Sequence, residues 1–263
     1  GIQKYFSGVH ALRGVNFDLR AGEVHALMGE NGAGKSTLIK VLCGIHQKDG
    51  GTIEYLGEQT SFSNIGDSQN AGISVIHQEL NMMNDLTVAQ NMFIGREFFK
   101  GGLIDDKAME EEAQRQFDKM GVKIDPATRL GDLTVGKQQM VEIAKALSKQ
   151  CSILILDEPT AALNEKDSKN LLDLLKSLQA EGMTCIIISH KLNEIFEISD
   201  RISVLRDGEF VDLPLEKCGY SYKNSVFMRT NDVILGGVLH LEKRDEQTVE
   251  GEIQRWIEKR SHL

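Results

Sequence analysis

The feature that most constrains this chain is a glycine-rich segment that directly follows a short apolar run. The run covers residues 24–28, and the segment Gly29-Glu30-Asn31-Gly32-Ala33-Gly34-Lys35-Ser36-Thr37 matches the pattern G-x-x-x-x-G-K-[ST]-T. Glycines let the backbone turn tightly enough for several N–H groups to point at one phosphate chain. A helix expected over residues 36–43 would present its positively polarised N-terminus to the same anion. Strand, loop and helix therefore occur in the order of a phosphate-binding loop in an α/β core.

The residue types in this loop suit a nucleotide and Mg²⁺. Lys35 would bring a positive charge to the β- and γ-phosphates, and the hydroxyl of Ser36 is a hard oxygen ligand that suits Mg²⁺. The residues expected to contact the nucleotide from this loop are Gly29, Asn31, Gly32, Ala33, Gly34, Lys35, Ser36 and Thr37.

Two acidic residues follow a second apolar run, over residues 153–156. Asp157 ends this predicted strand, where a charge cannot be buried without a partner, and bound Mg²⁺ is the expected partner, directly or through water. Glu158 comes next and is placed to polarise an attacking water. The alternative, two solvated acids at a strand end, is disfavoured by the phosphate loop upstream.

Two further polar residues come just after predicted strands. Gln78 follows the strand expected over residues 73–76, and His190 follows the apolar run 184–188. Because ligands of an open parallel sheet bind at the carboxyl ends of its strands, both residues should share an edge with the loop and the acids. We predict a γ-phosphate contact for His190 and a Mg²⁺ or water contact for Gln78. The predicted catalytic residues are Lys35, Gln78, Glu158 and His190, and the predicted Mg²⁺ ligands are Ser36, Gln78 and Asp157.

The alternation of strands and helices predicts an α/β fold, a P-loop NTPase core with a mostly parallel sheet flanked by helices. The N-terminal part favours antiparallel strands, one of them over residues 15–19, where apolar and polar residues alternate. A helical pattern predicts an inserted helical subdomain at about residues 80–150. Asp207-Gly208 is expected to turn a hairpin. We place an ATPase domain at residues 1–211 and a divergent C-terminal tail of unassigned structure at residues 212–263.

Composition bounds the function. The chain has 263 residues and a net charge of −9, which gives no sign of a nucleic-acid surface. No apolar run approaches the roughly 18 residues that span a bilayer. The cysteines are too far apart for a zinc site and are expected to be reduced, mostly buried thiols in a reducing compartment. These are Cys43, Cys151, Cys185 and Cys218.

A glycine-centred segment lies between the phosphate loop and the acids, Leu133-Thr134-Val135-Gly136-Lys137-Gln138-Gln139. It resembles the signature motif of ABC ATPases, in which one protomer's signature closes over the ATP held by another. From residue 1 to about residue 211 the chain looks like the ATP-binding subunit of a bacterial ABC importer. It is similar above all to the first half of the tandem subunits that power ribose, xylose and galactose uptake. Residues 76–80, 86–91, 135–147 and 188–195 also carry this resemblance.

The resemblance implies ATP and Mg²⁺ as cofactors, and ATP hydrolysis coupled to monosaccharide import. Phe6 would stack on adenine, and residues 161–164 would cross to a partner cassette. The implied partners are a second ABC ATPase half, transmembrane permease subunits and, indirectly, a sugar-binding protein, with no nucleic acid. The chain would then sit at the cytoplasmic face of the membrane, with permease docking across residues 79–96. The residues that would contact the partner's ATP are Thr134, Val135, Gly136 and Lys137.

The chain departs from the family pattern at three positions of its core. Thr134 stands where serine is common, Lys137 where glutamine is usual, and Asn164 where aspartate is usual. The last fifty residues do not match the second ATPase half with which that subfamily continues. Two alternatives stay open: an ABC ATPase with a non-sugar or non-transport role, and a truncated half that binds ATP but needs another half for hydrolysis. The transported sugar is not readable from the sequence.

Overall fold

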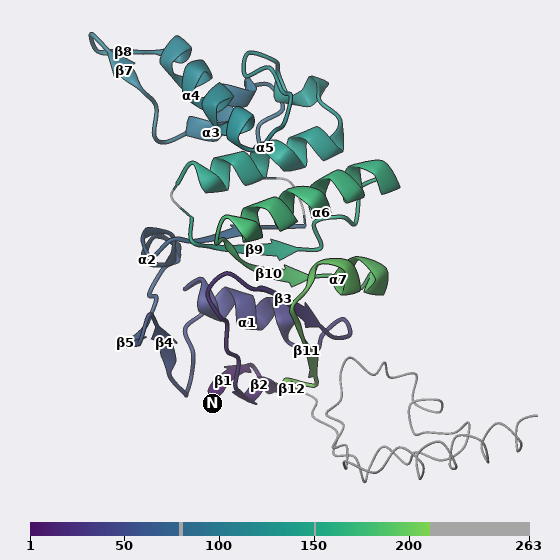
Figure 1. Cartoon of the computed structure of the whole chain (residues 1–263). Coiled ribbons are helices and arrows are strands. Elements are labelled where there is room, and N and C mark those ends of the chain that lie inside the picture. Colours follow the sequence, from purple (N-terminus) through teal and green to yellow (C-terminus); the bar gives the residue numbers. More distant parts are fainter. Residues whose placement is uncertain (79–80, 150, 211–263) are drawn as a thin grey trace, which may run out of the picture. The chain divides into compact units, whose positions relative to one another are not determined.

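The computed structural model describes residues 1–78, 81–149 and 151–210 (Figure 1). Glu79 and Leu80 of the expected docking segment, Val211, and the tail predicted at residues 212–263 lie outside the described residues. Cys218 lies there too, whereas Cys43, Cys151 and Cys185 are buried free thiols, as predicted.

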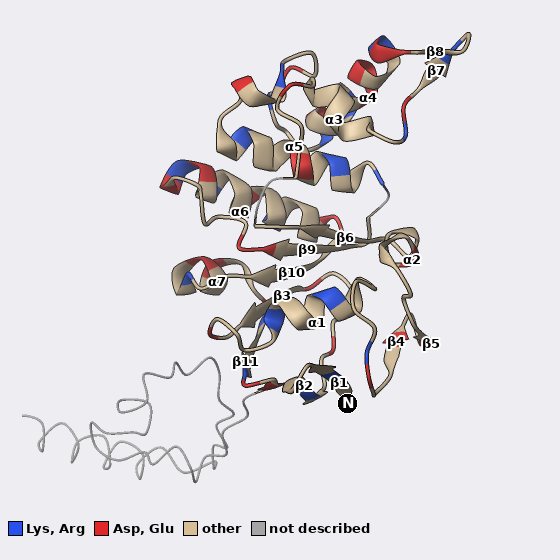
Figure 2. Ribbon diagram, turned by 180° about the vertical axis from the view of Figure 1, so that it is seen from behind, with Lys and Arg blue, Asp and Glu red and all other residues tan. Residues whose placement is uncertain are grey.

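A six-stranded sheet forms the centre of the fold, in the order β12-β11-β3-β10-β9-β6. All its pairings are parallel except that of the short terminal strand β12, which runs antiparallel to β11. The strands carry few charges along their length, whereas basic and acidic residues lie on helices and loops (Figure 2). The bounds are β3 Val24–Met28, β6 Ile73–Ile76, β9 Ile153–Asp157, β10 Thr184–Ile188, β11 Arg201–Arg206 and β12 Glu209–Phe210.

Successive side chains of these strands enter two different cores, as the two-residue period of a strand requires. Leu154 and Leu156 pack with helices α5, α6 and α7, while Ile155 packs with helix α1. Both faces of the sheet are therefore covered, which explains why its strands read as continuous apolar runs. The helix bounds are α1 Lys35–Leu42, α2 Ile65–Asn70, α5 Val135–Leu147, α6 Glu165–Ala180 and α7 Leu192–Ile198. The predicted P-loop α/β fold is confirmed.

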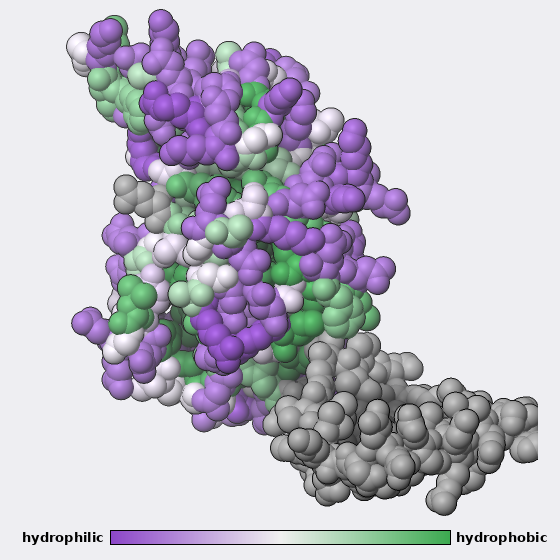
Figure 3. Space-filling view, in the orientation of Figure 1, coloured by the Kyte–Doolittle hydropathy of each residue, from purple (hydrophilic) through white to green (hydrophobic). Residues whose placement is uncertain are grey.

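Two more helices, α3 (Val88–Phe93) and α4 (Asp106–Lys119), lie between β6 and β9 in the chain and pack with α5. The buried side chains of α4 are Met109, Ala113 and Phe117, which recur at the spacing of one helix face. A small hairpin between α3 and α4 was not predicted: β7 Phe99–Lys100 and β8 Leu103–Ile104, joined by Gly101 and Gly102. Three of its apolar side chains are exposed: Phe99, Leu103 and Ile104. Apolar residues reach the surface at the upper left of Figure 3, where Figure 1 draws this hairpin in the same orientation.

The N-terminal part contains the hairpin of β1 (Ile2–Phe6) and β2 (Val9–Val15) and the smaller pair β4 (Ile53–Tyr55) and β5 (Glu58–Thr60). The strand expected over residues 15–19 is wrong, because β2 ends at Val15. Phe17 and Leu19 pack against the core, which produces the alternation. The polar residue between them, Asp18, does not pair with a strand and accepts two hydrogen bonds of 2.8 Å from the side chain of Arg201.

The hairpin of β11 and β12 turns at Asp207 and Gly208, as predicted. Both residues have positive φ, 52° and 82°, as a two-residue turn between twisted strands requires. Gly208 also braces the phosphate loop, because its N–H donates to Ala33 O at 3.0 Å and its carbonyl accepts from Arg13 N at 2.8 Å. Among the described residues, no helix has both the length and the apolar character needed to cross a bilayer.

Candidate nucleotide site

The candidate site lies at the edge where four parallel strands end. Ile188 of β10 pairs with Asp157 of β9 on one side and with Leu27 of β3 on the other. Ile76 of β6 is level with Leu156. The segments that leave this edge are therefore the phosphate loop after β3, His77-Gln78 after β6, Glu158 after β9 and Ser189-His190 after β10.

Two glycines of the phosphate loop are required by its close packing. Gly29 has φ 150°, and a Cβ there would lie 2.2 Å from the carbonyl oxygen of Leu205. Gly34 has φ 108° and stands at the N-cap of α1, where it supplies no side-chain acceptor. The first N–H groups of α1 are thus left without a side-chain cap at the point where a phosphate would bind.

Lys35 is held across its own loop. Its ammonium group donates to Gly29 O at 2.7 Å and to Glu30 O at 3.0 Å. These bonds engage two of its three protons. The charge is therefore fixed close to the loop backbone, in the position expected for a residue that contacts phosphate.

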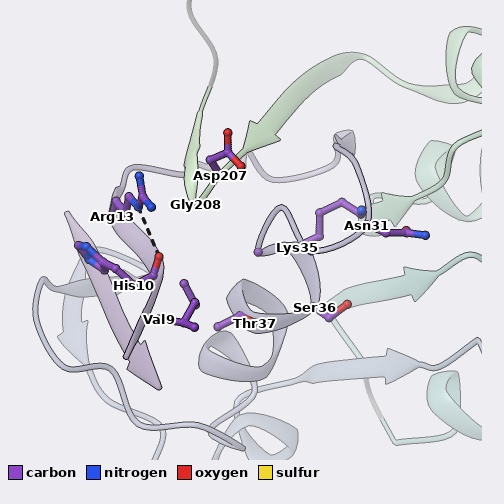
Figure 4. Close-up of a pocket in the computed structure, with 12 residues that line it drawn as sticks. Val9, His10, Arg13, Asn31, Lys35, Ser36, Thr37, Asp207 and Gly208 are labelled. Carbon is purple, nitrogen blue, oxygen red and sulfur yellow. Dashed lines mark hydrogen bonds between the residues drawn. The ribbon is translucent and has the colours of Figure 1, made fainter. Parts of the chain in front are cut away.

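A pocket of about 310 Å³ opens beside the loop (Figure 4). The loop residues Asn31, Gly32, Gly34, Lys35, Ser36 and Thr37 line one side of it. The other sides come from residues that were not predicted to line the site: Val9, His10, Ala11, Arg13, Asp207 and Gly208. The sequence spacing could have grouped three of these residues, because Val9, Ala11 and Arg13 alternate along one strand and therefore share a face.

Phe6 does not line this pocket. It ends β1 and pairs with Val9, a pocket residue, across the hairpin. Its ring is 38% exposed and lies edge-on to His46, with the ring centroids 5.1 Å apart. An exposed aromatic ring next to the pocket is compatible with adenine stacking, which stays a prediction.

Asp157 has the environment of a carboxylate that requires a cation. Burial raises its pKa, the adjacent Glu158 raises it further, and His77, Lys35 and Lys40 act in the opposite direction. Ser36 and Gln78 are exposed at the same edge, and they add hydroxyl and amide oxygens. Mg²⁺ is usually bound by one or two carboxylates together with substrate phosphates, so this donor set fits it. Within the described ranges, no cluster of three or more His, Cys, Asp or Glu side chains suits a metal ion.

Glu158 and His190 meet directly. The carboxylate oxygen Oε1 of Glu158 lies 3.2 Å from Nδ1 of His190, and the Glu158 N–H donates to Ile188 O at 2.8 Å. Glu158 has φ 48°, an uncommon conformation for a residue with a side chain, which costs about 1–3 kcal/mol. The two strand ends therefore hold Glu158 in a strained turn that directs it toward His190. The side chain of Glu158 is 21% exposed and that of His190 is 67% exposed, so the pair is open to a ligand.

The loop that follows Glu158 is fixed by α7. Lys191 donates to Thr160 O at 2.8 Å and pairs with Glu194 at 3.2 Å, and Thr160 donates its hydroxyl proton to Glu194 at 2.5 Å. None of these three residues was predicted to belong to the site. The three-residue spacing of Lys191 and Glu194 is a signal for their ion pair, but not for their distant partner Thr160.

The signature segment lies at the start of α5, and its residues are not among those that line the pocket. Thr134 is the N-cap, and its hydroxyl accepts a weak hydrogen bond from Lys137 N at 3.5 Å. Thr134, Val135 and Lys137 are exposed, whereas Gly136 is buried. Three of the four residues are thus free to contact another molecule.

Comparison with known proteins decides the family. The family model described as ABC transporter matches residues 12–161. The chain belongs to the ABC transporter family.

Two curated relatives match the same part of this ABC chain. The chain is 52% identical over 213 residues to the xylose import ATP-binding protein of Geobacillus kaustophilus. It is 52% identical over 214 residues to the L-arabinose transport ATP-binding protein of Geobacillus stearothermophilus. The alignments cover 80% and 81% of this chain but only 42% of each relative. The chain therefore spans less than half the length of these curated relatives.

Solved ABC cassettes have the same fold. A nucleotide-free cassette from an ABC transporter has a TM-score of 0.72 and 25% identity, with 80% of this chain and 87% of that chain covered. A dimeric cassette in a post-hydrolysis state, bound to ADP and phosphate, has a TM-score of 0.67 and 26% identity, with 80% and 94% covered. The ABC cassette fold thus extends over the greater part of this chain.

Proposed function

We propose that this chain is the ATP-binding and ATP-hydrolysing component of an ABC importer for a monosaccharide. The observation that carries the proposal is the convergence of the phosphate loop, Asp157-Glu158, Gln78 and His190 at one edge of the sheet. The sugar class is supported by the relatives, which are named for xylose import and for L-arabinose transport.

Each group at this edge has a separate role in ATP hydrolysis. The phosphate loop and the start of α1 bind the phosphate chain, and Lys35 neutralises part of its charge. Mg²⁺, held by Ser36, Gln78 and Asp157 together with phosphate oxygens, would neutralise the charge that develops between the β- and γ-phosphates. Glu158 accepts a proton from the attacking water as a general base. His190, 3.2 Å from Glu158, orients that carboxylate and contacts the γ-phosphate.

The proposed site is completed by a second cassette. The exposed residues Thr134, Val135 and Lys137 of this chain would contact the ATP of the partner, and the partner's signature would contact the ATP of this chain. The likeness to a dimeric cassette bound to ADP and phosphate supports this arrangement. ATP would then act as part of the interface between two cassettes.

The proposed permease-docking surface is formed by Met83 and Ile94, which are 56% and 39% exposed. Asn91 fixes the loop that carries Met83, because its side chain accepts from Met83 N at 2.8 Å and donates to Met83 O at 2.9 Å. Met82 is partly buried against the core, so Met83 is the better docking residue of the pair. A cytoplasmic helix of a permease would pack its apolar face here, at the cytoplasmic face of the membrane.

Transport tests this function. The chain is expressed with the binding protein and permease of a monosaccharide ABC importer, and uptake of labelled xylose, L-arabinose and ribose is measured in parallel with phosphate release. Uptake of one sugar should require ATP and should be lost with Glu158→Gln. ATP hydrolysis that continues while uptake of every monosaccharide is absent would indicate a non-transport role.

Docking is tested in the same assay by Met83→Asp. This change should lower uptake while phosphate release by the purified chain stays unchanged. Leu103→Asp is the matched control, because Leu103 is 77% exposed on the β7–β8 hairpin, away from Met83 in the sequence. Equal uptake by Met83→Asp and Leu103→Asp would place the docking surface elsewhere.

A further inference from the structure

The glycine of the signature segment is covered from within its own chain. Gly136 is buried in the first turn of α5, and a Cβ built there would lie 2.7 Å from both Cγ and Oδ2 of Asp167. It would also lie 2.9 Å from Cβ of Asp167. Real Cβ atoms essentially never approach so closely, so the side chain of Asp167 occupies the space that any other residue at position 136 would need.

Asp167 belongs to the helix that follows the segment expected to cross to the partner. It lies in the first turn of α6, and Asn164, the last residue of the segment 161–164, is the N-cap of that helix. The Asn164 side chain accepts from Asp167 N at 2.9 Å and donates its amide proton to Asp167 Oδ2 at 2.9 Å. The same carboxylate oxygen that bonds Asn164 therefore lies against Gly136.

This arrangement explains one departure from the family pattern. The amide of Asn164 can accept from Asp167 N and also donate to the Asp167 carboxylate, whereas an ionised carboxylate can only accept. The usual aspartate would keep the first bond, lose the second and place two carboxylates side by side. Asn164 and Asp167 thus form a matched pair in this chain.

We propose that Asp167 is a positioning residue that joins the signature segment 134–137 to the crossing segment 161–164, so that the two move as one unit. The inference rests on the proposed function, in which both segments act on the partner cassette. Thr134 and Asn164 cap the two helices that Asp167 brings together. ATP bound by the partner then acts on the signature segment and the crossing segment together.

The packing link is tested by rescue. Gly136→Ala should lower the melting temperature and the ATPase rate, because its Cβ meets Asp167. Asp167→Gly removes all three crowded atoms, so it should restore the melting temperature of Gly136→Ala. The ATPase rate should stay low, because the link to the crossing segment is lost with the Asp167 side chain. Asp173→Gly is the matched control, since it is the same change at an exposed position of α6. Rescue by Asp173→Gly equal to that by Asp167→Gly would overturn the link.

The positioning role is tested by a measurement that a packing defect alone would not change, namely ATP-dependent association compared with nucleotide affinity. In a Glu158→Gln background, ATP-dependent association of the chain is followed by light scattering, and nucleotide affinity of the monomer is measured separately. Asp167→Ala should raise the ATP concentration needed for association at least about tenfold, with monomer affinity unchanged. Asp167→Asn should recover most of the association, because its amide oxygen still accepts from Asn164 and fills the same space.

Different results would contradict the proposed function and the positioning role of Asp167. If Glu158→Gln alone does not associate with ATP, the two-cassette part of the proposed function is wrong, and the positioning role is wrong with it. If Glu158→Gln associates and the added Asp167→Ala change leaves that association intact, the proposed function stands and the inference about Asp167 is overturned. A parallel loss of monomer affinity would also overturn it, because Asp167 would then act on folding of the whole cassette.

Discussion

The strand-end edge and the start of α5 are both expected to contact ATP, yet they are built in different ways. At the edge, parallel register alone aligns Leu27, Asp157 and Ile188, and the groups of the site bond to one another within the chain. At the start of α5, one buried glycine lies under Asp167 and exposed residues surround it. The first region is thus preformed within the chain, and in the proposed function the second is a surface that needs a partner. Under that proposal the cassette holds its own ATP and supplies part of the contacts to the ATP of its partner.

Asp157 at the edge and Glu142 of α5 are both half-buried acids, and they differ in what offsets the cost of burying their charge. Burial is the largest cause of the raised pKa of both Asp157 and Glu142, and the pKa of Glu142 reaches about 7. Asp157 faces the phosphate loop, where a cation and its ligand would remove the penalty. Glu142 lies in the middle of α5, where Lys145 and the backbone N–H of Asn81 only partly offset it.

The largest expected effect is at the edge. Glu158→Gln should lower ATP turnover by roughly 10²–10⁴-fold, because the amide cannot accept a proton from water. Nucleotide affinity should stay unchanged, and both quantities are measured on the purified chain by phosphate release and by titration calorimetry. Glu165→Gln, an exposed change in the first turn of α6, is the control. Turnover at the wild-type rate in Glu158→Gln would remove Glu158 from the mechanism and leave the edge as a binding site only.

Loss of the Lys35 side chain should instead weaken nucleotide binding at the edge. Lys35→Ala removes a charged partner of the phosphates, and hydrogen bonds to charged groups contribute about 1.5–3 kcal/mol, so affinity should fall by roughly 10–100-fold. Lys40→Ala, at an exposed position of the same helix, should change affinity much less. Titration with a fluorescent ATP analogue measures both. Equal affinities for the two variants would mean that the backbone of the loop carries phosphate binding alone.

These differences explain how much of the molecule is predictable from its sequence. Strand ends are predictable because a buried parallel strand is a continuous apolar run, so residue order alone placed Asp157, Gln78 and His190 at one edge. The Asp207-Gly208 turn was equally predictable from its residue types. The contact of Gly136 with Asp167 was not, because it depends on how two helices pack. The false strand over 15–19 arose because Phe17 and Leu19 imitate a strand's alternation while packing as irregular chain.

Glu142 in the middle of α5 makes the stability of the folded protein depend on pH. The pKa of its carboxyl is raised from 4.5 to about 7 in the folded state, so stability is lost as pH rises through this window and the full penalty is present above pH 7. Its Oε2 has no hydrogen-bond partner within the described part of the chain. Glu142→Gln should be about 1–3 kcal/mol more stable than the wild type at pH 8 and nearly equal to it at about pH 4.5. Urea unfolding at both pH values measures this, with exposed Glu181→Gln as the control. Parallel pH profiles for wild type and Glu142→Gln would show that Glu142 is solvated.

The smallest effect should come from the matched pair beside the signature. Asn164→Asp keeps the helix cap, since aspartate caps as well as asparagine, so any loss of stability reports the clash of two carboxylates and the lost amide bond. We expect a loss of about 1 kcal/mol in unfolding free energy and a several-fold weaker ATP-dependent association. Adding Asp167→Asn should restore both, because the new amide donates to the new carboxylate. If Asn164→Asp weakens association and Asp167→Asn does not restore it, residue 164 acts on the partner directly. The crossing segment would then be a second contact with the partner, independent of the signature segment.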